Sequence, residues 1–331
     1  MKSSIPIDKR TFFSNHSQAE FTELSLGVFN YQYKNIKVYR DFIDALGVKT
    51  RAVKSLEDIP FMPIEFFKTF DIISNVKNSS MVFKSSGTTG IKRSRHFIQD
   101  IDIYKYSFTK AFQLFYGNIT NYVVLALLPS YIENGDSSLV YMANNLIKSS
   151  KNKDSGFYLN NYSALIEKLD ELKTRKKKVL LLGVSYALLD LVEQKKFDFP
   201  SLIIMETGGM KGRRKELIRK ELHEKLCQGF GVKSIHSEYG MTELLSQAYS
   251  KADGVFSCPP WMKILIRDVN DPFSYMKQGK SGAVNIIDLA NIHSASFLAT
   301  QDLGKIINPH EFEILGRFDN SDIRGCNLLV V

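Results

Sequence analysis

The sequence has few cysteines: Cys227, Cys258 and Cys326 are the only three among 331 residues. An odd number of widely spaced cysteines argues against a disulfide framework and against a zinc site. A reducing compartment suits such a chain, and we expect it to be cytoplasmic.

Long hydrophobic runs are also absent. The longest, residues 179–192, has about 14 residues, includes Asp190, and is too short to cross a bilayer. The first residues, Met1–Pro6, open no apolar signal region. We therefore expect no stable membrane anchor.

A concentrated basic patch is missing too, although the formal net charge is +9. The densest basic run, residues 173–178, ends an amphipathic segment, where the helix dipole favours cations without any partner. It is accompanied by neither zinc-finger spacing nor the aromatic motif of RNA-recognition domains. We therefore expect no nucleic-acid partner.

Buried-strand patterns alternate with helical patterns between about residues 80 and 240. The expected strands cover 81–83, 122–128, 178–183, 202–207 and 234–236. The expected helices cover 100–115, 137–147, 162–174, 184–195 and 215–227, after one or two more within 18–46. This alternation predicts right-handed βαβ units and a mostly parallel sheet flanked by helices.

After residue 256 the pattern changes to short β-like runs at 261–267, 282–288, 296–300 and 311–315. The fold class is therefore expected to be α/β with a smaller β-rich subdomain. We expect a single large domain over residues 1–331. Its parts are a helical N-terminal part (1–80), an α/β core (81–255) and the β-rich part (256–331).

The loop at residues 85–93 reads Ser-Ser-Gly-Thr-Thr-Gly-Ile-Lys-Arg. Its glycines let backbone N–H groups approach a ligand, its hydroxyls add donors, and Lys92 and Arg93 suit a polyphosphate. It is not a Walker A loop, because no Gly-Lys-Ser/Thr follows at the required spacing. Taken alone, it is either a phosphate-binding loop or an ordinary surface loop.

Polar groups also follow the later expected strands. Gly208 and Gly209 either admit a flat ring at close range or start a helix. In the run His-Ser-Glu-Tyr-Gly-Met-Thr-Glu (236–243), Tyr239 can stack on a base. Carboxylates such as Glu243 hold Mg²⁺ beside nucleotide phosphates. Asp302, in a Gln-Asp-Leu-Gly loop, offers a carboxylate of the kind that accepts from ribose hydroxyls.

These loops occur in one order: Ser-Ser-Gly-Thr-Thr-Gly, Tyr-Gly-Met-Thr-Glu, Gln-Asp-Leu-Gly, then Gly-Arg-x-Asp followed by Arg-Gly. Together they resemble the adenylate-forming superfamily of acyl-CoA synthetases, peptide-synthetase adenylation domains and luciferases. The segments 59–68 and 236–240 are most similar to LuxE-type acyl-protein synthetases, with phenylacetate-CoA ligases next. The resemblance extends from about residue 59 to the C-terminus. It implies the N-terminal-domain fold of that superfamily, with ATP and Mg²⁺ as cofactors.

The resemblance implies roles for individual positions. Lys92 and Glu243 would act in catalysis. Lys92 would bind the ATP phosphates, and Glu243 would hold Mg²⁺ beside them. The residues implied to contact ATP are Ser86, Thr88, Thr89, Gly90, Lys92, Gly208, Gly209, Glu238, Tyr239, Gly240, Thr242, Asp302 and Arg317.

The sequence departs from the superfamily pattern near its end. It stops at Val331, soon after Gly325, without the small mobile domain that carries a catalytic lysine in relatives. Charge stabilisation would then come from Lys92, Arg93, Lys211 or a partner protein. In LuxE-type enzymes the acyl group passes to a cysteine near the C-terminus, and Cys326 fits by position. Otherwise Cys326 is a small buried residue of a final strand.

The sequence therefore predicts an acyl-adenylate-forming ligase that activates a carboxylic acid with ATP and transfers the acyl group to a protein thiol. A fatty acid suits the 23 phenylalanines and 15 tyrosines. An acyl-accepting protein or a reductase would be the partner. Two alternatives remain open: an acyl-CoA ligase that uses CoA directly, and a nucleotide-binding subunit without catalysis.

Overall fold

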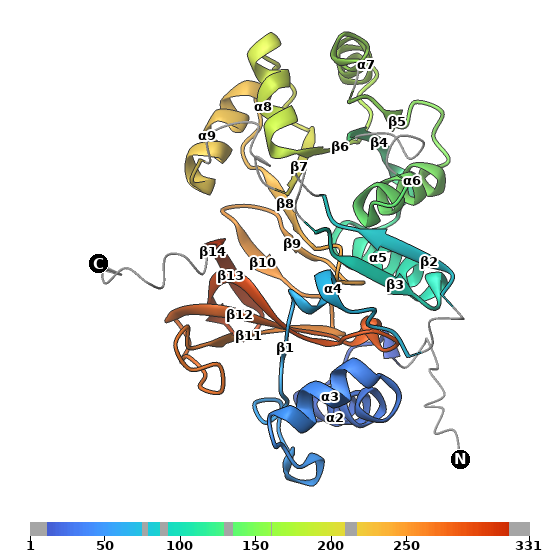
Figure 1. Ribbon diagram of the computed structural model, residues 1–331. Coiled ribbons are helices and arrows are strands. Elements are labelled where there is room, and N and C mark those ends of the chain that lie inside the picture. The colour runs from blue at the N-terminus through green and yellow to red at the C-terminus, as the bar shows by residue number, and fades with distance from the viewer. Residues whose placement is uncertain are drawn as a thin grey trace.

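The computed structural model describes residues 12–74, 79–86, 92–128, 135–159, 161–208 and 217–317. Its centre is a twelve-stranded sheet with the order β11-β12-β13-β14-β10-β9-β8-β7-β6-β4-β5, and β1 pairs with β13 (Figure 1). The strands of this sheet are β1 (Met62–Pro63), β4 (Val123–Leu127), β5 (Gly156–Phe157), β6 (Val179–Val184), β7 (Ile203–Thr207), β8 (His236–Tyr239), β9 (Ala248–Ser250), β10 (Val255–Ser257), β11 (Met262–Arg267), β12 (Ser281–Asp288), β13 (Phe297–Asn308) and β14 (Glu311–Arg317).

The helices accompany this sheet as the alternating pattern predicts. They are α2 (Gln18–Asn35), α3 (Lys37–Ala45), α4 (Phe66–Thr69), α5 (Ile101–Tyr116), α6 (Ser138–Ser150), α7 (Tyr162–Thr174), α8 (Ser185–Gln194) and α9 (Arg219–Phe230), with the short 3₁₀ helices η1 (Thr50–Ala52), η3 (Ile119–Asn121) and η4 (Leu289–Asn291). Asp100 is the N-cap of α5, because its side chain accepts from the N–H of Asp102.

The strands β5, β4, β6, β7 and β8 are parallel neighbours. Burial explains their sequences: all residues of β4 and β6 are buried, and the strands are runs of Val, Leu, Ala and Gly. The chain passes from β4 outward to β5, but from β6 through β7 to β8 in the opposite direction. Right-handed crossovers therefore place α8 and α9 on one face and α6 on the other (Figure 1).

The remaining strands β9 to β14 are antiparallel and continue the same sheet, since β8 pairs with β9. The predicted fold class is confirmed: an α/β part with a mostly parallel sheet precedes a β-rich part. The two parts share one sheet, which sequence periodicity alone did not reveal.

The strand predicted at 81–83 is confirmed as β2 (Met81–Lys84), but its expected place in the large sheet was wrong, because it forms a separate antiparallel hairpin with β3 (Arg95–Ile98). A second prediction was also wrong. The Gln-Asp-Leu-Gly run is not a loop, because β13 continues through Asp302 to Asn308. Gly304 serves close packing there, as a Cβ would lie 2.6 Å from the Glu313 carbonyl oxygen.

The N-terminal helices pack against the β-rich part. A capping box between Ser17 and Glu20 starts α2. The buried Gln32 of α2 then donates to the Ser296 hydroxyl at 2.9 Å, and Tyr39 of α3 stacks on Phe297. The N-terminal segment is thereby fixed to β13, the strand that carries Asp302.

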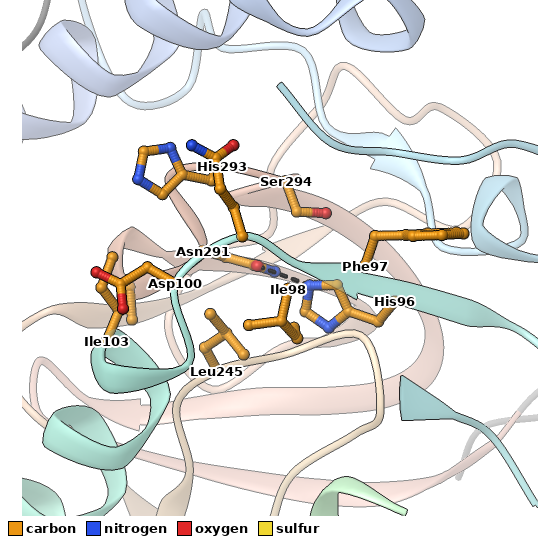
Figure 2. Close-up of a pocket in the computed structure, with 11 residues that line it drawn as sticks. His96, Phe97, Ile98, Asp100, Ile103, Leu245, Asn291, His293 and Ser294 are labelled. Carbon is orange, nitrogen blue, oxygen red and sulfur yellow. Dashed lines mark hydrogen bonds between the residues drawn. The ribbon is translucent and has the colours of Figure 1, made fainter. Parts of the chain in front are cut away.

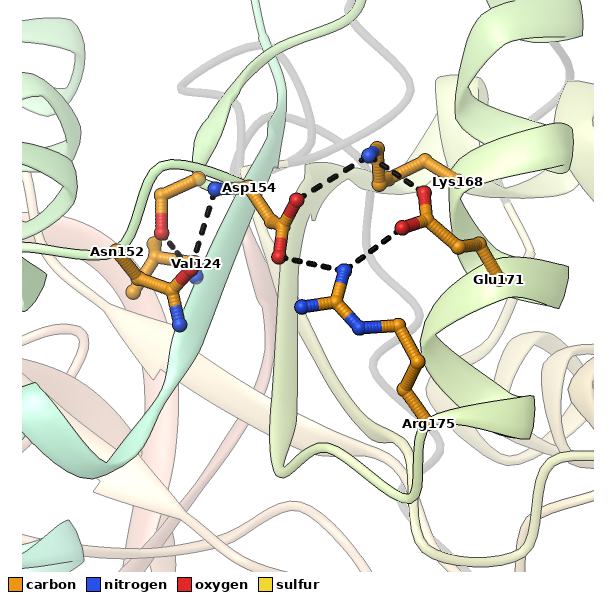
Figure 3. Close-up of polar contacts among 7 residues, drawn as sticks. Val124, Asn152, Asp154, Lys168, Glu171 and Arg175 are labelled. Atoms are coloured by element: carbon orange, nitrogen blue, oxygen red, sulfur yellow. Dashed lines mark hydrogen bonds and ion pairs between the residues drawn. The ribbon is translucent and has the colours of Figure 1, made fainter.

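A polar cluster fixes the connection from α6 to α7 (Figure 3). The Asp154 side chain is only 7% exposed and accepts from Lys168 at 3.3 Å and Arg175 at 2.9 Å. Glu171 pairs with both cations. This cluster joins the turn before β5 to α7, and Val124 N of β4 donates to the adjacent Ser155 hydroxyl at 2.9 Å. No helix in the described ranges is long and apolar enough to cross a membrane.

Candidate functional site

The candidate site lies where β7 and β8 end. These strands are parallel, with Thr207 beside Glu238 in the register, so Gly208 and Gly240, which follow the strands, lie at the same edge of the sheet. Gly208 follows Thr207 with φ 63°, in the left-handed region that favours glycine. Gly240 follows β8, and a Cβ there would lie 2.4 Å from Glu238 Oε1. The backbone conformation therefore favours glycine at 208, whereas at 240 a Cβ would crowd the Glu238 side chain.

A buried network centred on Glu206 supports the Gly208 turn. The Ser185 hydroxyl, at the start of α8, is 3.1 Å from Glu206 Oε2 and 2.7 Å from the Gly208 carbonyl oxygen. His223 Nε2 of α9 lies 3.5 Å from Glu206 Oε1. Burial raises the pKa of the Glu206 carboxyl, but hydrogen bonds from His223 and Ser237 and the nearby Arg219 charge outweigh it, so the pKa is lowered overall. Glu206 is thus an ionised anchor beneath the loop.

Glu238, in the neighbouring strand, has the opposite shift. Its carboxyl is buried and accepts from the Thr207 hydroxyl. Burial, with the repulsion of Glu206, raises the pKa of Glu238 to about 7, although the Thr207 hydrogen bond opposes the shift. The site therefore contains two adjacent buried carboxyls of different protonation behaviour.

Tyr239, Asp302 and Arg317 come together although they are far apart in sequence. The Tyr239 hydroxyl donates to Asp302 Oδ2 at 2.7 Å, and Arg317 Nε lies 3.5 Å from Asp302 Oδ1. The Tyr239 ring is buried and makes edge contacts with Phe256 and Phe312. Burial raises the pKa of Asp302, while the Tyr239 hydrogen bond and the Arg317 charge lower it. The strands β8, β13 and β14 place these groups.

The described residues of the Ser/Thr/Gly segment, Ser85, Ser86 and Lys92 to Ser94, lie at the end of the β2–β3 hairpin and are termed the hairpin tip. Ser85 N donates to the Ser94 carbonyl oxygen at 3.1 Å, and Ser94 N donates to the Ser85 hydroxyl at 2.9 Å. Arg93 Nε donates to the Ser85 carbonyl oxygen, which directs this cation along the hairpin base. Ser86 and Lys92 are exposed. Thr88, Thr89 and Gly90 lie outside the described residues, as do Gly209 and Lys211.

Glu243 is buried beside this hairpin. Glu243 is only 8% exposed, and burial raises the pKa of its carboxyl, while a hydrogen bond from the Ser94 side chain opposes the rise. Its carbonyl oxygen accepts from Asn291 Nδ2 at 2.7 Å. The carbonyl oxygen of Thr242 is 2.8 Å from His96 Nδ1. The structure therefore places the Thr242–Glu243 backbone against both β3 and η4.

Neither cysteine in the described ranges has an activated thiol. Burial raises the pKa of Cys258 far above its ordinary value, and it also raises the pKa of the half-buried Cys227. Cys326, the predicted acyl acceptor, lies outside the described residues. Among the residues that the structure describes, no group of three or more His, Cys, Asp or Glu side chains is arranged to hold a metal ion.

Sequence reasoning missed the buried groups that hydrogen-bond to the backbone of residues 242–246. His96 and Asn291 are the main examples, because they contact each other 195 positions apart at 2.9 Å. Asp288 is another: its carboxylate accepts from the N–H groups of Leu245 and Ser246 just after Glu243. Pairing over such separations leaves no signal in spacing or periodicity.

Comparisons with known proteins found a similar ligase sequence and solved structures with a similar fold. No family model matches the sequence. The long-chain-fatty-acid–luciferin-component ligase of Vibrio harveyi is 24% identical over 355 residues, covering 96% of this chain and 89% of that protein. This similarity confirms the resemblance predicted from the motifs.

Solved structures share the fold. The open conformation of 2-hydroxyisobutyryl-CoA ligase, in complex with 2-HIB-AMP and CoA, superposes with a TM-score of 0.70 and 14% identity, over 96% of this chain and 77% of that one. ATP-bound MatB from Rhodopseudomonas palustris gives 0.53 and 18%, over 73% and 49%. The chain therefore has the fold of adenylate-forming ligases, and along nearly its whole length it is similar to a fatty-acid ligase.

Proposed function

We propose that this protein uses ATP to convert a carboxylic acid to acyl-AMP and then transfers the acyl group to a thiol. The observation that carries the proposal is the contact of Asp302 with both Tyr239 and Arg317. This contact brings three of the sequence motifs together, although Asp302 lies 63 positions after Tyr239 and 15 positions before Arg317. The similarity to the Vibrio harveyi ligase supports the same activity.

In the proposed reaction a carboxylate oxygen attacks the α-phosphorus of ATP, and pyrophosphate leaves. Two anions must be oriented and their charge neutralised. Gly208 and Tyr239 would bound the adenine, and Asp302 with Arg317 would hold the ribose hydroxyls. The hairpin tip, with Ser86 and Lys92, would receive the β- and γ-phosphates. Thr88, Thr89, Gly90 and Gly209 belong to the same proposal.

Mg²⁺ is proposed to lie at Glu243. Burial without a cation favours the protonated carboxyl, and a divalent ion with phosphate oxygens would favour the ionised form. Thr242 and the hairpin tip would contact the ATP phosphates. Bound Mg²⁺ would neutralise the charge of the leaving pyrophosphate.

The proposed substrate is a long-chain fatty acid. The relative's name refers to long-chain fatty acids, and the core contains the aromatic groups Tyr104, Phe108 and Tyr249, with the partly buried Tyr116 packed against it. The experiment is exchange of labelled pyrophosphate into ATP, with acids of two to eighteen carbons. We expect exchange only when an acid is present, and most with long chains. No exchange with any acid would refute the proposed reaction.

Cys326 is the proposed acyl acceptor, from which the group would pass to a partner protein or reductase. We expect Cys326→Ser to abolish acylation of the protein in mass spectra while leaving pyrophosphate exchange unchanged. Cys227→Ser is the matched control, because the pKa of its half-buried thiol is raised, and it should retain acylation. An acylated Cys326→Ser protein would refute this role.

The related CoA ligase structures favour a second candidate, direct transfer to CoA. Wild-type protein with preformed acyl-AMP separates the two. Rapid acyl-CoA formation with no protein-bound acyl intermediate would support the CoA ligase. Protein acylation that does not require CoA supports transfer to the protein thiol.

A further inference from the structure

His96 connects three segments at the candidate site. It lies in β3, two residues after Ser94, which closes the base of the hairpin tip. Its Nδ1 is 2.8 Å from the Thr242 carbonyl oxygen, and its Nε2 is 2.9 Å from Asn291 Oδ1. The ring is fully buried and is packed edge-on by Phe67. The proposed reaction assigns no role to the His96 ring.

The orientation of Asn291 is set by its other contacts. Its Nδ2 donates to the carbonyl oxygens of Glu243 at 2.7 Å and Ala295 at 2.9 Å. An amide turned the other way would set its oxygen against both carbonyls, so Oδ1 must face His96. Both ring nitrogens of His96 consequently face acceptors. A neutral ring donates to one of them, and a protonated ring donates to both.

The space around this contact is filled. Figure 2 shows the His96 ring directed at Asn291 within a small pocket that His293 and Leu245 also line. The cavity measures about 10 Å³, which is about the space of one water molecule. A substrate does not fit, so His96 acts through its neighbours rather than by touching a ligand.

We propose that His96 is a positioning residue, which together with Asn291 fixes the Thr242–Glu243 backbone against the β2–β3 hairpin. Asn291 holds the carbonyl of Glu243, and the His96 ring lies between the preceding carbonyl and Asn291 Oδ1 and donates to one of them. The carboxyl of Glu243 is thereby kept at Ser94, next to the hairpin tip. This inference rests on the proposed adenylation, in which the hairpin tip and the Thr242–Glu243 segment both bind the ATP phosphates with Mg²⁺.

Three substitutions separate the two hydrogen bonds. His96→Asn places an amide donor near the position of Nδ1, and His96→Gln places one near that of Nε2. His96→Leu fills the site without either bond. We expect kcat for acid-dependent pyrophosphate exchange to fall on the order of a hundredfold in His96→Leu, because small displacements of reacting groups have such effects. Of the Asn and Gln variants, the one that restores the bond donated by the neutral ring should retain about tenfold more activity than Leu.

The Michaelis constant for the acid should stay within about twofold in all three variants, because the buried His96 ring contacts no ligand directly. His293→Leu is the matched control. This second histidine of the same pocket is partly buried and bonds to Tyr31 of α2 at 3.2 Å. It should lower the melting temperature without lowering kcat. Folding is checked by thermal unfolding of each variant.

Distinct outcomes would overturn the inference. They are a kcat for His96→Leu within twofold of wild type, Asn and Gln variants as inactive as Leu while folded, or an equal loss of kcat in His293→Leu. Failure of the adenylation proposal would look different, because wild-type protein itself would then show no exchange with any acid. If His96→Leu does not fold, the Asn and Gln variants decide.

Discussion

The two sides of the candidate site are supported in different ways. Beneath Gly208, the Glu206 carboxylate is ionised, and its contacts with Ser185 and His223 span 21 and 17 positions. Beneath Glu243, the contacts of His96 with Thr242 and Asn291 span 146 and 195 positions. Burial lowers the pKa of His96 to about 4.

The difference follows from topology. Successive βα units of a parallel sheet bring their strand ends to one edge, so the Gly208 side is built from neighbouring units. The Glu243 side lies where the hairpin, β8 and η4 converge. A charged local anchor supports one side, and a long-range network of uncharged groups supports the other. Four substitutions test this contrast, in order of decreasing expected effect.

The largest effect is expected from Asn291→Leu. The substitution leaves the buried carbonyl oxygens of Glu243 and Ala295 without their donor. Each unsatisfied buried group costs about 1–3 kcal/mol, so the free energy of unfolding should fall by about 3 kcal/mol or more. Urea denaturation measures it. Asn145→Leu, which removes one bond within α6, is the control, and equal losses would contradict a special role for Asn291.

The next effect is a pH-dependent one at Glu238. Its folded-state pKa, about 7, lies above the ordinary value of 4.5. Its contribution to stability is therefore complete below pH 4.5 and is lost as the pH rises through 7. Relative to wild type, Glu238→Gln should gain up to about 3 kcal/mol between pH 4 and pH 8. Denaturation at both pH values tests this, and a pH-independent difference would show that the carboxyl does not titrate as described.

Glu206→Gln should have the opposite pH dependence. The lowered pKa of Glu206 means that its contribution is present above pH 4.5 and is lost as the pH falls through the folded-state pKa. Hydrogen bonds to a charged group contribute about 2 kcal/mol, which the variant should lose at pH 7 and no longer show in acid. Melting temperatures across this range provide the measurement. A loss that grows on acidification would be incompatible with an ionised Glu206.

The smallest effect is expected from Ser185→Ala. The hydroxyl contacts Glu206 and the Gly208 carbonyl oxygen, and its loss should cost about 1 kcal/mol. Because Gly208 belongs to the proposed adenine site, the affinity for ATP should fall more than the affinity for the acid. Calorimetric titration with ATP measures this. Ser155→Ala, far from the site in the α6–α7 connection, is the control, and matching ATP affinities in the two variants would argue against the adenine assignment.

Several elements follow directly from sequence patterns. The buried runs predict β4, β6 and β7, and α7 occupies the predicted residues 162–174. The pairing of β2 with β3 was missed because each strand has only four residues. The sequence of so short a strand does not indicate which strand it pairs with. Asp302 was assigned to a loop because Gln-Asp-Leu-Gly is typical of a turn. In the structure, Gly304 allows close strand packing instead.

The sequence by itself determined the alternating α/β pattern, the glycine-containing turn after β7, and the order of the polar motifs. These depend on local backbone preference and on burial of neighbouring side chains. Only the tertiary structure decided that Asp302 joins Tyr239 and Arg317, that His96 meets Asn291, and that Glu206 and Glu238 have opposite pKa shifts. Each of these results depends on which distant groups are buried together. Charges are weakly screened in the buried interior, so each neighbouring charge and hydrogen bond changes the pKa values there.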